Sequence, residues 1–219
     1  MNTISSLKIL IVDDHEAVLN GTLSTLKAEY PTATIDTAIT AQEVFIQLAE
    51  NVPELLLVDL ALPETPGEPP QTETGIRLLR TIMETYLDLN IVVQSAHIRS
   101  LIRLKPTIDT YQGGFTIADK NLPMKEMLVK VDWAIKGVIY TPPAMRNGME
   151  VRPEWLEVIR LAFQEGLQDK AIAERMKVSE RTVRNYWNKA QNILNVYPEE
   201  GKNIRIQTEI RARQEGWID

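Results

Sequence analysis

Four apolar runs in this sequence each end at residues that carry a reactive polar group: a carboxylate, a hydroxyl or an ammonium. A short continuous apolar run is typical of a strand buried on both faces of a parallel sheet. The carboxyl ends of such strands meet at one edge, where ligands bind, so we expect these ionic groups to lie close together. One aspartate after a core strand is ordinary, but three acids near a hydroxyl and an ammonium suit a cation-binding site. The residues are Asp13, Asp14, Asp59, Ser95 and Lys120.

Helical patterns separate these apolar runs. Apolar residues recur at helical spacing after the first run, and a short strand precedes a second helix that Thr40 can cap. We expect Val44, Phe45 and Leu48 on the buried side of that second helix. Pro106 predicts that the helix between residues 98 and 111 is short or kinked. Five alternating units of strand and helix predict a doubly wound, parallel, five-stranded sheet.

Periodicity weakens after residue 136, where Pro142-Pro143 and Asn147-Gly148 indicate a linker. We therefore predict a first domain over 1–136, a linker over 137–152 and a small all-α domain over 153–219. In the last of these, Ser179 is the expected N-cap of the longest helix. That helix carries a core stripe of four residues: Val183, Trp187, Ala190 and Leu194. Its other face is polar and comprises Arg181, Arg184, Asn185, Asn188 and Lys189.

The charge is unevenly distributed along the 219 residues. Residues 150–219 contain 12 basic and 12 acidic residues, so the net charge of −6 falls on residues 1–149. An acidic first part suits a cation site, whereas a neutral second part requires any nucleic-acid binding to come from a local patch. The chain has no cysteine, no secretory leader and no apolar run of membrane-spanning length. We expect a soluble, cytoplasmic protein.

The two acids, the single acid, the Ser and the Lys, in this chain order, resemble the receiver domain of two-component response regulators, which has a flavodoxin-like fold. The resemblance implies that a sensor histidine kinase phosphorylates Asp59. It implies that Asp13, Asp14, Asp59 and the carbonyl of Ala61 bind Mg²⁺. Lys120 then pairs with Asp59 and its acyl phosphate, and Ser95 hydrogen-bonds a phosphoryl oxygen.

The helical end resembles the helix-turn-helix domain of NarL/LuxR-type regulators. The match includes Ile172-Ala173-Glu174-Arg175, Val178 to Arg184, and Leu194-Asn195-Val196. The resemblance implies binding of double-stranded DNA as a homodimer. It implies that Arg184, Asn185 and Asn188 face bases, and that Thr182 and Lys189 contact phosphate, with Arg181 on the same face.

Some positions depart from the receiver pattern. Residues 64–74 form an insertion rich in Pro, Gly, Thr and Glu, which we expect to be an exposed loop. Ile117 stands three residues before Lys120, near the place where the family usually has its switch aromatic. We call the sheet edge that is expected to hold Asp13, Asp14 and Asp59 the acid edge. His15 and His97 flank it, and two histidines without further ligands at a suitable spacing do not make a zinc site. We interpret both as solvent-exposed polar residues.

The leading hypothesis is a response regulator, which is not an enzyme, and three alternatives stay open. A phosphorylation-independent regulator is favoured by the insertion, by Pro106 and by the missing aromatic. A module whose helical end binds protein is favoured by the neutral charge of residues 150–219. A metal-dependent phosphatase would need a second catalytic acid near Asp59, and the sequence does not supply one.

Overall fold

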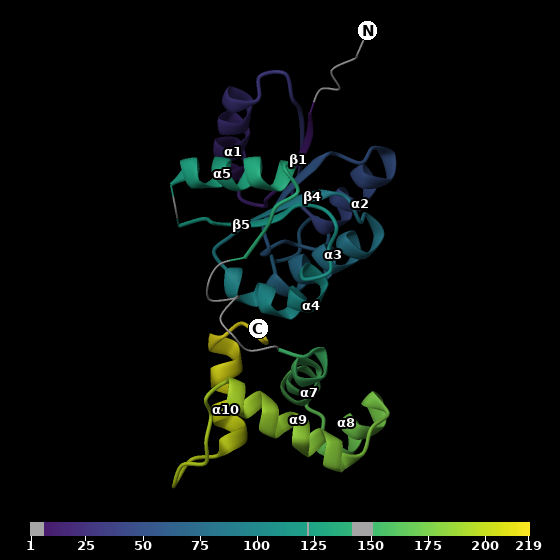
Figure 1. Cartoon of the computed structure of the whole chain (residues 1–219), viewed down its shortest axis with the longest axis vertical. Coiled ribbons are helices and arrows are strands. Elements are labelled where there is room, and N and C mark those ends of the chain that lie inside the picture. The colour runs from purple at the N-terminus through teal and green to yellow at the C-terminus, as the bar shows by residue number, and fades with distance from the viewer. Residues whose placement is uncertain (1–6, 122, 142–150) are drawn as a thin grey trace. The chain divides into compact units, whose positions relative to one another are not determined.

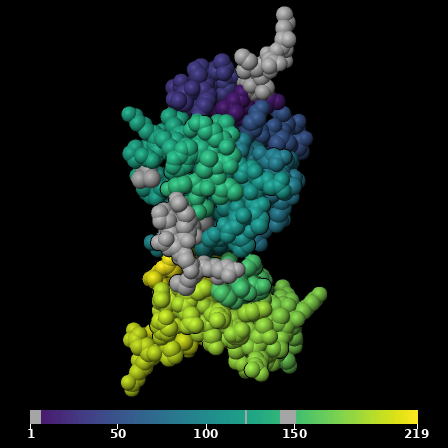
Figure 2. Space-filling model, viewed as in Figure 1, coloured from purple at the N-terminus to yellow at the C-terminus, as the bar shows by residue number. Residues whose placement is uncertain are grey.

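The structure is a computed structural model that describes residues 7–121, 123–141 and 151–219. The chain forms two compact units. The first comprises Met1–Ile98 and Thr107–Pro143, and the second comprises Arg99–Pro106 and Ala144–Asp219. Figure 2 shows the surface of each unit from the side seen in Figure 1. Among the described residues, no helix is both long enough and apolar enough to cross a membrane.

A parallel sheet forms the centre of the first unit. Its strand order is β2-β1-β3-β4-β5-β6, which places the switch in connection direction between β1 and β3. The central strands are almost fully buried because their apolar runs face helices on both sides. The strands are β1 Lys8–Val12, β2 Thr34–Ala38, β3 Leu55–Val58, β4 Asn90–Ser95, β5 Phe115–Asp119 and β6 Ile139–Tyr140.

Helices cover both faces of this sheet (Figure 1). Alternate residues of β1 and β3 pack with α1 and α5 on one face, where Leu26 and Val131 are fully buried. The helices α2 and α3 cover the other face. The helices of the first unit are α1 Glu16–Glu29, α2 Ala41–Glu50, α3 Thr72–Thr85 and α5 Met124–Ile135. The 3-10 helix η1 Ile98–Leu104 and the helix α4 Lys105–Ile108 each include residues of both units.

The expected doubly wound parallel sheet is confirmed, but the strand count was wrong, since the sheet has six strands. The additional strand, β6, falls inside the predicted linker. Phe115 N–H donates to the carbonyl of Val138 at 3.0 Å, and the Lys130 ammonium lies over the rings of Trp133 and Tyr140 at 4.0 and 3.7 Å. A two-residue strand is too short to show periodicity in the sequence. Residues 142–150 of the predicted linker lie outside the described residues.

The expectations for the helices are confirmed with one exception. The Thr40 hydroxyl caps α2 by accepting from Glu43 N–H at 3.1 Å, and the segment around Pro106 is a 3-10 helix followed by a four-residue helix. The prediction for Phe45 was wrong, because its side chain is 37% exposed. Val44 and Leu48, four residues apart, face the sheet, and Phe45 lies one position further round the helix.

Residues 66–71 of the insertion after β3 are exposed, as expected, but the predicted end of the loop was wrong, because residues 72–74 belong to α3 and Thr74 is buried. Leu62 and Gln71 form an antiparallel bridge, and α3 begins directly afterwards at Thr72. Gly75, in the first turn of α3, packs so closely on Leu60 that a Cβ would overlap the Leu60 carbonyl. This contact fixes the chain immediately after Asp59.

The second unit contains four helices between residues 151 and 219: α7 Pro153–Phe163, α8 Asp169–Met176, α9 Glu180–Ile193 and α10 Ile204–Gln214. Pro153 begins α7, a position at which its missing N–H costs nothing. Ser179 caps α9, as predicted, by accepting from Thr182 N–H at 3.1 Å. The predicted core stripe of α9 is buried, with Val183 and Ala190 fully enclosed. The opposite stripe of α9 is thereby left at the surface.

The close packing of Gly75 gives a first prediction. Gly75→Ala should lower the free energy of unfolding by about 1–3 kcal/mol, because the added methyl group must displace the Leu60 backbone. The matched control is Gly21→Ala in the interior of α1, where the nearest side-chain atom is 4.0 Å from the new Cβ. Removing a helix glycine there should stabilise by about 1 kcal/mol. Urea denaturation of both variants measures the two effects, and equal stability of the two would contradict this account.

Candidate functional site

The acid edge lies at the switch point between β1 and β3. Asp13 and Asp59 are the residues that follow these strands, and their backbones remain in the sheet's hydrogen-bond pattern. Asp59 N–H donates to the carbonyl of Val12 at 2.9 Å, and Asp13 N–H donates to the carbonyl of Ala38 at 3.2 Å. Both carboxylates are therefore held by backbone and are 3% and 4% exposed. Two acids this buried require a compensating cation.

Lys120 supplies that cation. Its ammonium lies 2.6 Å from an oxygen of Asp13 and 2.6 Å from an oxygen of Asp59. Burial acts to lower the pKa of Lys120, but hydrogen bonding and attraction to the two carboxylates outweigh it, so the pKa is raised above its usual value. The ammonium is charged at neutral pH. The structure thus brings together three of the predicted site residues around one contact.

The acid edge retains oxygen atoms that suit a cation. Asp59 accepts from the N–H of Leu60 with its other oxygen at 2.6 Å, which fixes the carboxylate plane. Asp14 Oδ1 is buried and has no hydrogen-bond partner among the described residues. One ligand atom from each of Asp13, Asp14 and Asp59 lies within 4.8 Å of the others. This donor set of hard oxygens fits a divalent cation such as Mg²⁺.

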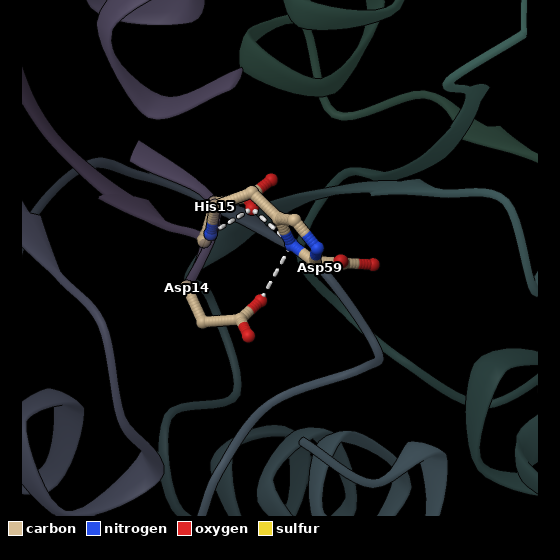
Figure 3. A group of neighbouring side chains, drawn as sticks. Asp14, His15 and Asp59 are labelled. Carbon is tan, nitrogen blue, oxygen red and sulfur yellow. Dashed lines mark hydrogen bonds and ion pairs between the residues drawn. The ribbon is translucent and has the colours of Figure 1, made fainter. Parts of the chain in front are cut away.

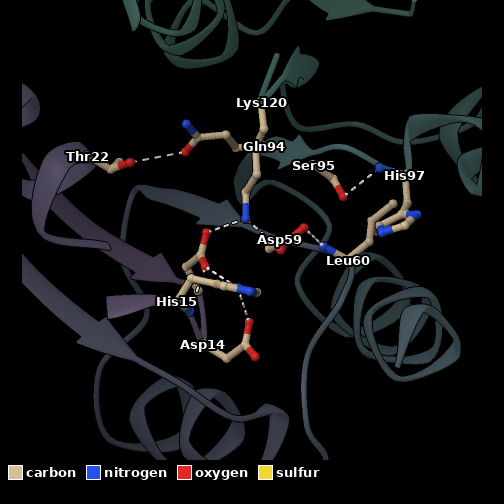
Figure 4. Close-up of polar contacts among 10 residues, drawn as sticks. Asp14, His15, Thr22, Asp59, Leu60, Gln94, Ser95, His97 and Lys120 are labelled. Carbon is tan, nitrogen blue, oxygen red and sulfur yellow. Dashed lines mark hydrogen bonds and ion pairs between the residues drawn. The ribbon is translucent and has the colours of Figure 1, made fainter. Parts of the chain in front are cut away.

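Ser95 lies at the end of β4 beside Lys120 and Asp59 (Figure 4). Its side chain is fully buried, and its Oγ accepts from the backbone N–H of His97 at 3.1 Å. Within the described part of the chain, the hydroxyl hydrogen of Ser95 has no acceptor and is free to donate. Gln94 turns away and accepts from Thr22 of α1 at 3.3 Å. Ala61 lies half-buried in the loop after β3.

His15 is solvent-exposed beside the acids, as expected, but its contact with them was not predicted from the sequence. Its side chain is 61% exposed, yet Nδ1 lies 2.8 Å from an oxygen of Asp14 (Figure 3). The sequence does place His15 directly after Asp13 and Asp14, and the structure puts it at the N-cap of α1. The other histidine, His97, is exposed, and its backbone N–H donates to Ser95.

The second candidate site is the surface stripe of α9. Arg181, Arg184, Asn185, Asn188 and Lys189 are all exposed, as the sequence predicts. Thr182 differs, because it is half-buried and its hydroxyl lies 2.9 Å from that of Ser179 in the N-cap. The stripe therefore presents two kinds of group, cationic and amide, that can contact an anionic, hydrogen-bonding partner.

Charge pairing distinguishes this stripe from the rest of the second unit. In α7 and α10, basic side chains form ion pairs within the unit, such as Arg160 with Glu157 and Arg213 with Glu209. Five basic residues between 151 and 219 have no ion-pair partner among the described residues, and all lie in α8, α9 or the turn between them. They are Lys170, Lys177, Arg181, Arg184 and Lys189. Residues 150–219, whose net charge is zero, thus carry a locally cationic surface.

A polar cluster fixes the orientation of α9. Asp169 accepts from the indole N–H of Trp187 at 3.1 Å and from Arg205 of α10 at 2.9 Å. The Arg205 guanidinium also lies 3.5 Å from the centroid of the Trp187 ring, whose other contact is Phe163 at 5.5 Å. Burial lowers the pKa of Arg205, partly offset by Asp169, but a guanidinium remains charged. Three helices are thereby tied at one point.

A prediction follows for the Lys120 contact. Lys120→Met leaves the carboxylates of Asp13 and Asp59 facing each other without a cation, so the free energy of unfolding should fall by about 3–5 kcal/mol. Millimolar Mg²⁺ should stabilise this variant more than the wild type. Lys136→Met is the matched control, because it removes an exposed ion pair with Asp132 and should change stability by less than about 1 kcal/mol. Urea titrations with and without Mg²⁺ test both statements. Wild-type stability of Lys120→Met would refute the prediction.

Comparison with known proteins agrees with this geometry. Residues 9–111 match the model of the response regulator receiver domain. The transcriptional regulatory protein YdfI of Bacillus subtilis (strain 168) is 28% identical over 224 residues, which cover 95% of this chain and 96% of YdfI. The oxygen regulatory protein NreC of Staphylococcus carnosus (strain TM300) is 24% identical over 197 residues, which cover 81% of this chain and 86% of NreC.

The same fold occurs in a solved structure of RcsB from Salmonella enterica serovar Typhimurium, bound to promoter rprA in the presence of the phosphomimetic BeF₃⁻. That structure is 22% identical, covers 94% of this chain and 98% of its own, and has a TM-score of 0.58. Residues 9–111 therefore match a response regulator receiver domain, and nearly the whole chain is similar in sequence to a transcriptional regulatory protein.

Proposed function

We propose that this response regulator accepts a phosphoryl group on Asp59 from a sensor histidine kinase and controls transcription by binding DNA through α9. The observation that carries the proposal is the Lys120 ammonium, held at 2.6 Å from both Asp13 and Asp59 at the switch point of the sheet. Binding to double-stranded DNA would occur in the cytoplasm. The chain would act there as a homodimer.

The transfer step needs one nucleophilic oxygen. A carboxylate oxygen of Asp59 attacks the phosphorus of a phosphohistidine, a P–O bond forms, and the P–N bond to the kinase imidazole breaks with its electron pair going to nitrogen. Lys120 already contacts Asp59 and would pair with the phosphoryl oxygens as negative charge moves onto them. Because the Lys120 ammonium is shared with Asp13, it can change partners without leaving the site.

A divalent cation would be held by Asp13, Asp14, Asp59 and the backbone carbonyl of Ala61. When bound, Mg²⁺ offsets the repulsion between the carboxylates and the incoming phosphoryl group. The buried Oδ1 of Asp14, which accepts no hydrogen bond from any residue that the structure describes, supports this assignment, since a carboxylate oxygen is costly to bury without one. No residue outside the acid edge is needed for the transfer.

Ser95 would connect the phosphoryl group to the following segment. Its free hydroxyl hydrogen can donate to a phosphoryl oxygen. The same Oγ accepts from the His97 N–H and so connects Ser95 to the loop after β4. A change of hydrogen-bond partner at Ser95 would therefore alter that loop. A regulator that works without phosphorylation is the alternative, and it is favoured by Ile117, a buried aliphatic residue near the position of the usual switch aromatic.

DNA binding would use the exposed stripe of α9 as a recognition helix. Arg184, Asn185 and Asn188 carry groups that can read base edges. Lys189 and Thr182, whose hydroxyl contacts that of Ser179, are suited to phosphate. Arg181 is exposed in the first turn of the same face. The grouping of unpaired cations on α8 and α9 favours DNA over a protein partner, because a neutral protein surface would leave them unneutralised.

The acceptor assignment predicts the result of chemical phosphorylation. Incubation with a small phosphodonor and Mg²⁺ should add one phosphoryl group to the wild type, detected by intact-protein mass spectrometry. Asp59→Asn keeps the volume but removes the nucleophile, so it should take up none and bind Mg²⁺ more weakly. Asp36→Asn, which removes an exposed carboxylate of β2, should behave as the wild type. Equal uptake by Asp59→Asn would exclude this acceptor, and no uptake by the wild type would favour the phosphorylation-independent regulator.

The recognition-helix assignment predicts different effects for two side chains. Arg184→Ala should relax the preference at one base position in each half-site, at a cost of about 1–3 kcal/mol for the preferred sequence. Lys189→Ala should weaken binding to all sequences and reduce the salt dependence. Arg213→Ala, which removes a cation paired with Glu209 on α10, is the control and should do neither. Selection of sites from random DNA, followed by affinity measurements over a salt series, distinguishes these outcomes. The absence of any enriched motif with phosphorylated wild type would favour the protein-binding alternative.

A further inference from the structure

Among the described contacts, none gives the imidazole of His15 a role in stabilising the fold. His15 occupies the N-cap position of α1, but its side chain makes no capping hydrogen bond. It is largely exposed and is held only at its backbone, whose N–H donates to Asp13 Oδ1 at 2.9 Å. The ring nevertheless turns toward the acids, with Nδ1 2.8 Å from Asp14 Oδ1 and 3.5 Å from Asp13 Oδ1 (Figure 3).

The His15 ring and the Asp14 carboxylate are in close contact without the alignment of a hydrogen bond. Asp14 Oδ1 is buried and lacks a hydrogen-bond partner among the described residues, although Nδ1 is only 2.8 Å away. Two ligand atoms at right angles on one ion, each about 2.1 Å from it, are about 3 Å apart. The separation of Nδ1 and Oδ1 is that of neighbouring ligands on one cation.

The remaining donors lie in reach of the same point. One ligand atom from each of Asp13, Asp14, His15 and Asp59 falls within 4.8 Å of the others. Lys120 occupies the Oδ2 atoms of Asp13 and Asp59, whereas His15 approaches the Oδ1 atoms of Asp13 and Asp14. The ammonium and the imidazole therefore approach different oxygens, and a cation beside His15 need not displace Lys120.

We propose that His15 Nδ1 is a ligand of the divalent cation at the acid edge, and that this nitrogen makes the site favour a first-row transition cation such as Mn²⁺ over Mg²⁺. The inference rests on the proposed function, because it concerns the cation that assists phosphoryl transfer to Asp59. Carboxylates accept both ions, but imidazole is a poor ligand for Mg²⁺ and a better one for the softer transition ions. His15 would take a position otherwise filled by water.

Pulsed electron paramagnetic resonance of the full-length protein with bound Mn²⁺ tests the ligation directly. Nitrogen coupling of the strength given by a directly bound imidazole should appear in the wild type and vanish in His15→Gln. Because the chain has only two histidines, the matched control is His97→Gln, which should keep the coupling. Labelling the histidines with ¹⁵N should change the coupling in the wild type and thereby exclude Lys120 as its source.

Calorimetric titrations measure the consequence for selectivity. His15→Gln should lose on the order of tenfold or more in Mn²⁺ affinity and less than about twofold in Mg²⁺ affinity, since only the transition ion gains from the nitrogen. His97→Gln should change neither affinity. Bound Mn²⁺ without imidazole coupling, or equal losses for both ions, would overturn the ligation by His15 and leave the metal-assisted transfer intact. Failure of the wild type to bind either ion would overturn both.

Discussion

The structure of the acid edge depends on one cation placed between two buried carboxylates. Asp13 and Asp59 follow adjacent strands, whereas Lys120 follows β5, which is separated from β3 by β4. Two strand spacings amount to roughly 10 Å, a distance that a lysine and an aspartate can close only by reaching toward each other across the end of β4. The small, fully buried Ser95 stands at that end. The order of strands, the length of Lys120 and the size of Ser95 are thus parts of one constraint.

This constraint explains why the acid edge could be predicted from the sequence. A parallel sheet brings strand ends to one side whatever the loops do, so Asp13, Asp59 and Lys120 are brought together by strand order alone. Thr40 and Ser179 were equally predictable as helix caps, because capping depends on a side chain and an N–H group only three residues away. The core stripe of α9 follows from helical spacing in the same way.

The features that the sequence did not predict depend on distances between elements. Whether Phe45 is buried depends on how far α2 is rotated against the sheet, and periodicity cannot resolve one position on a helix. The strand β6 depends on the packing of Lys130 over the rings of Trp133 and Tyr140 and on parallel pairing with β5. The direction of the His15 ring depends on its χ angles, which no spacing encodes. In each case the local pattern was compatible with the observed structure and with another one.

Residues 150–219 show how a segment of zero net charge can still present a charged surface. Ion pairs such as those of Arg160 and Arg213 neutralise cations away from α9, and Arg205 is engaged by Asp169 and the Trp187 ring. The cations of α8 and α9 are left to interact with a partner. Paired charges on the remaining surface contribute little long-range attraction at physiological salt, where the screening length is about 8 Å. DNA binding of the proposed kind would depend on short-range contacts of a single helix face. Such contacts would favour sequence reading over nonspecific adhesion, and a second copy of the chain would add to the affinity.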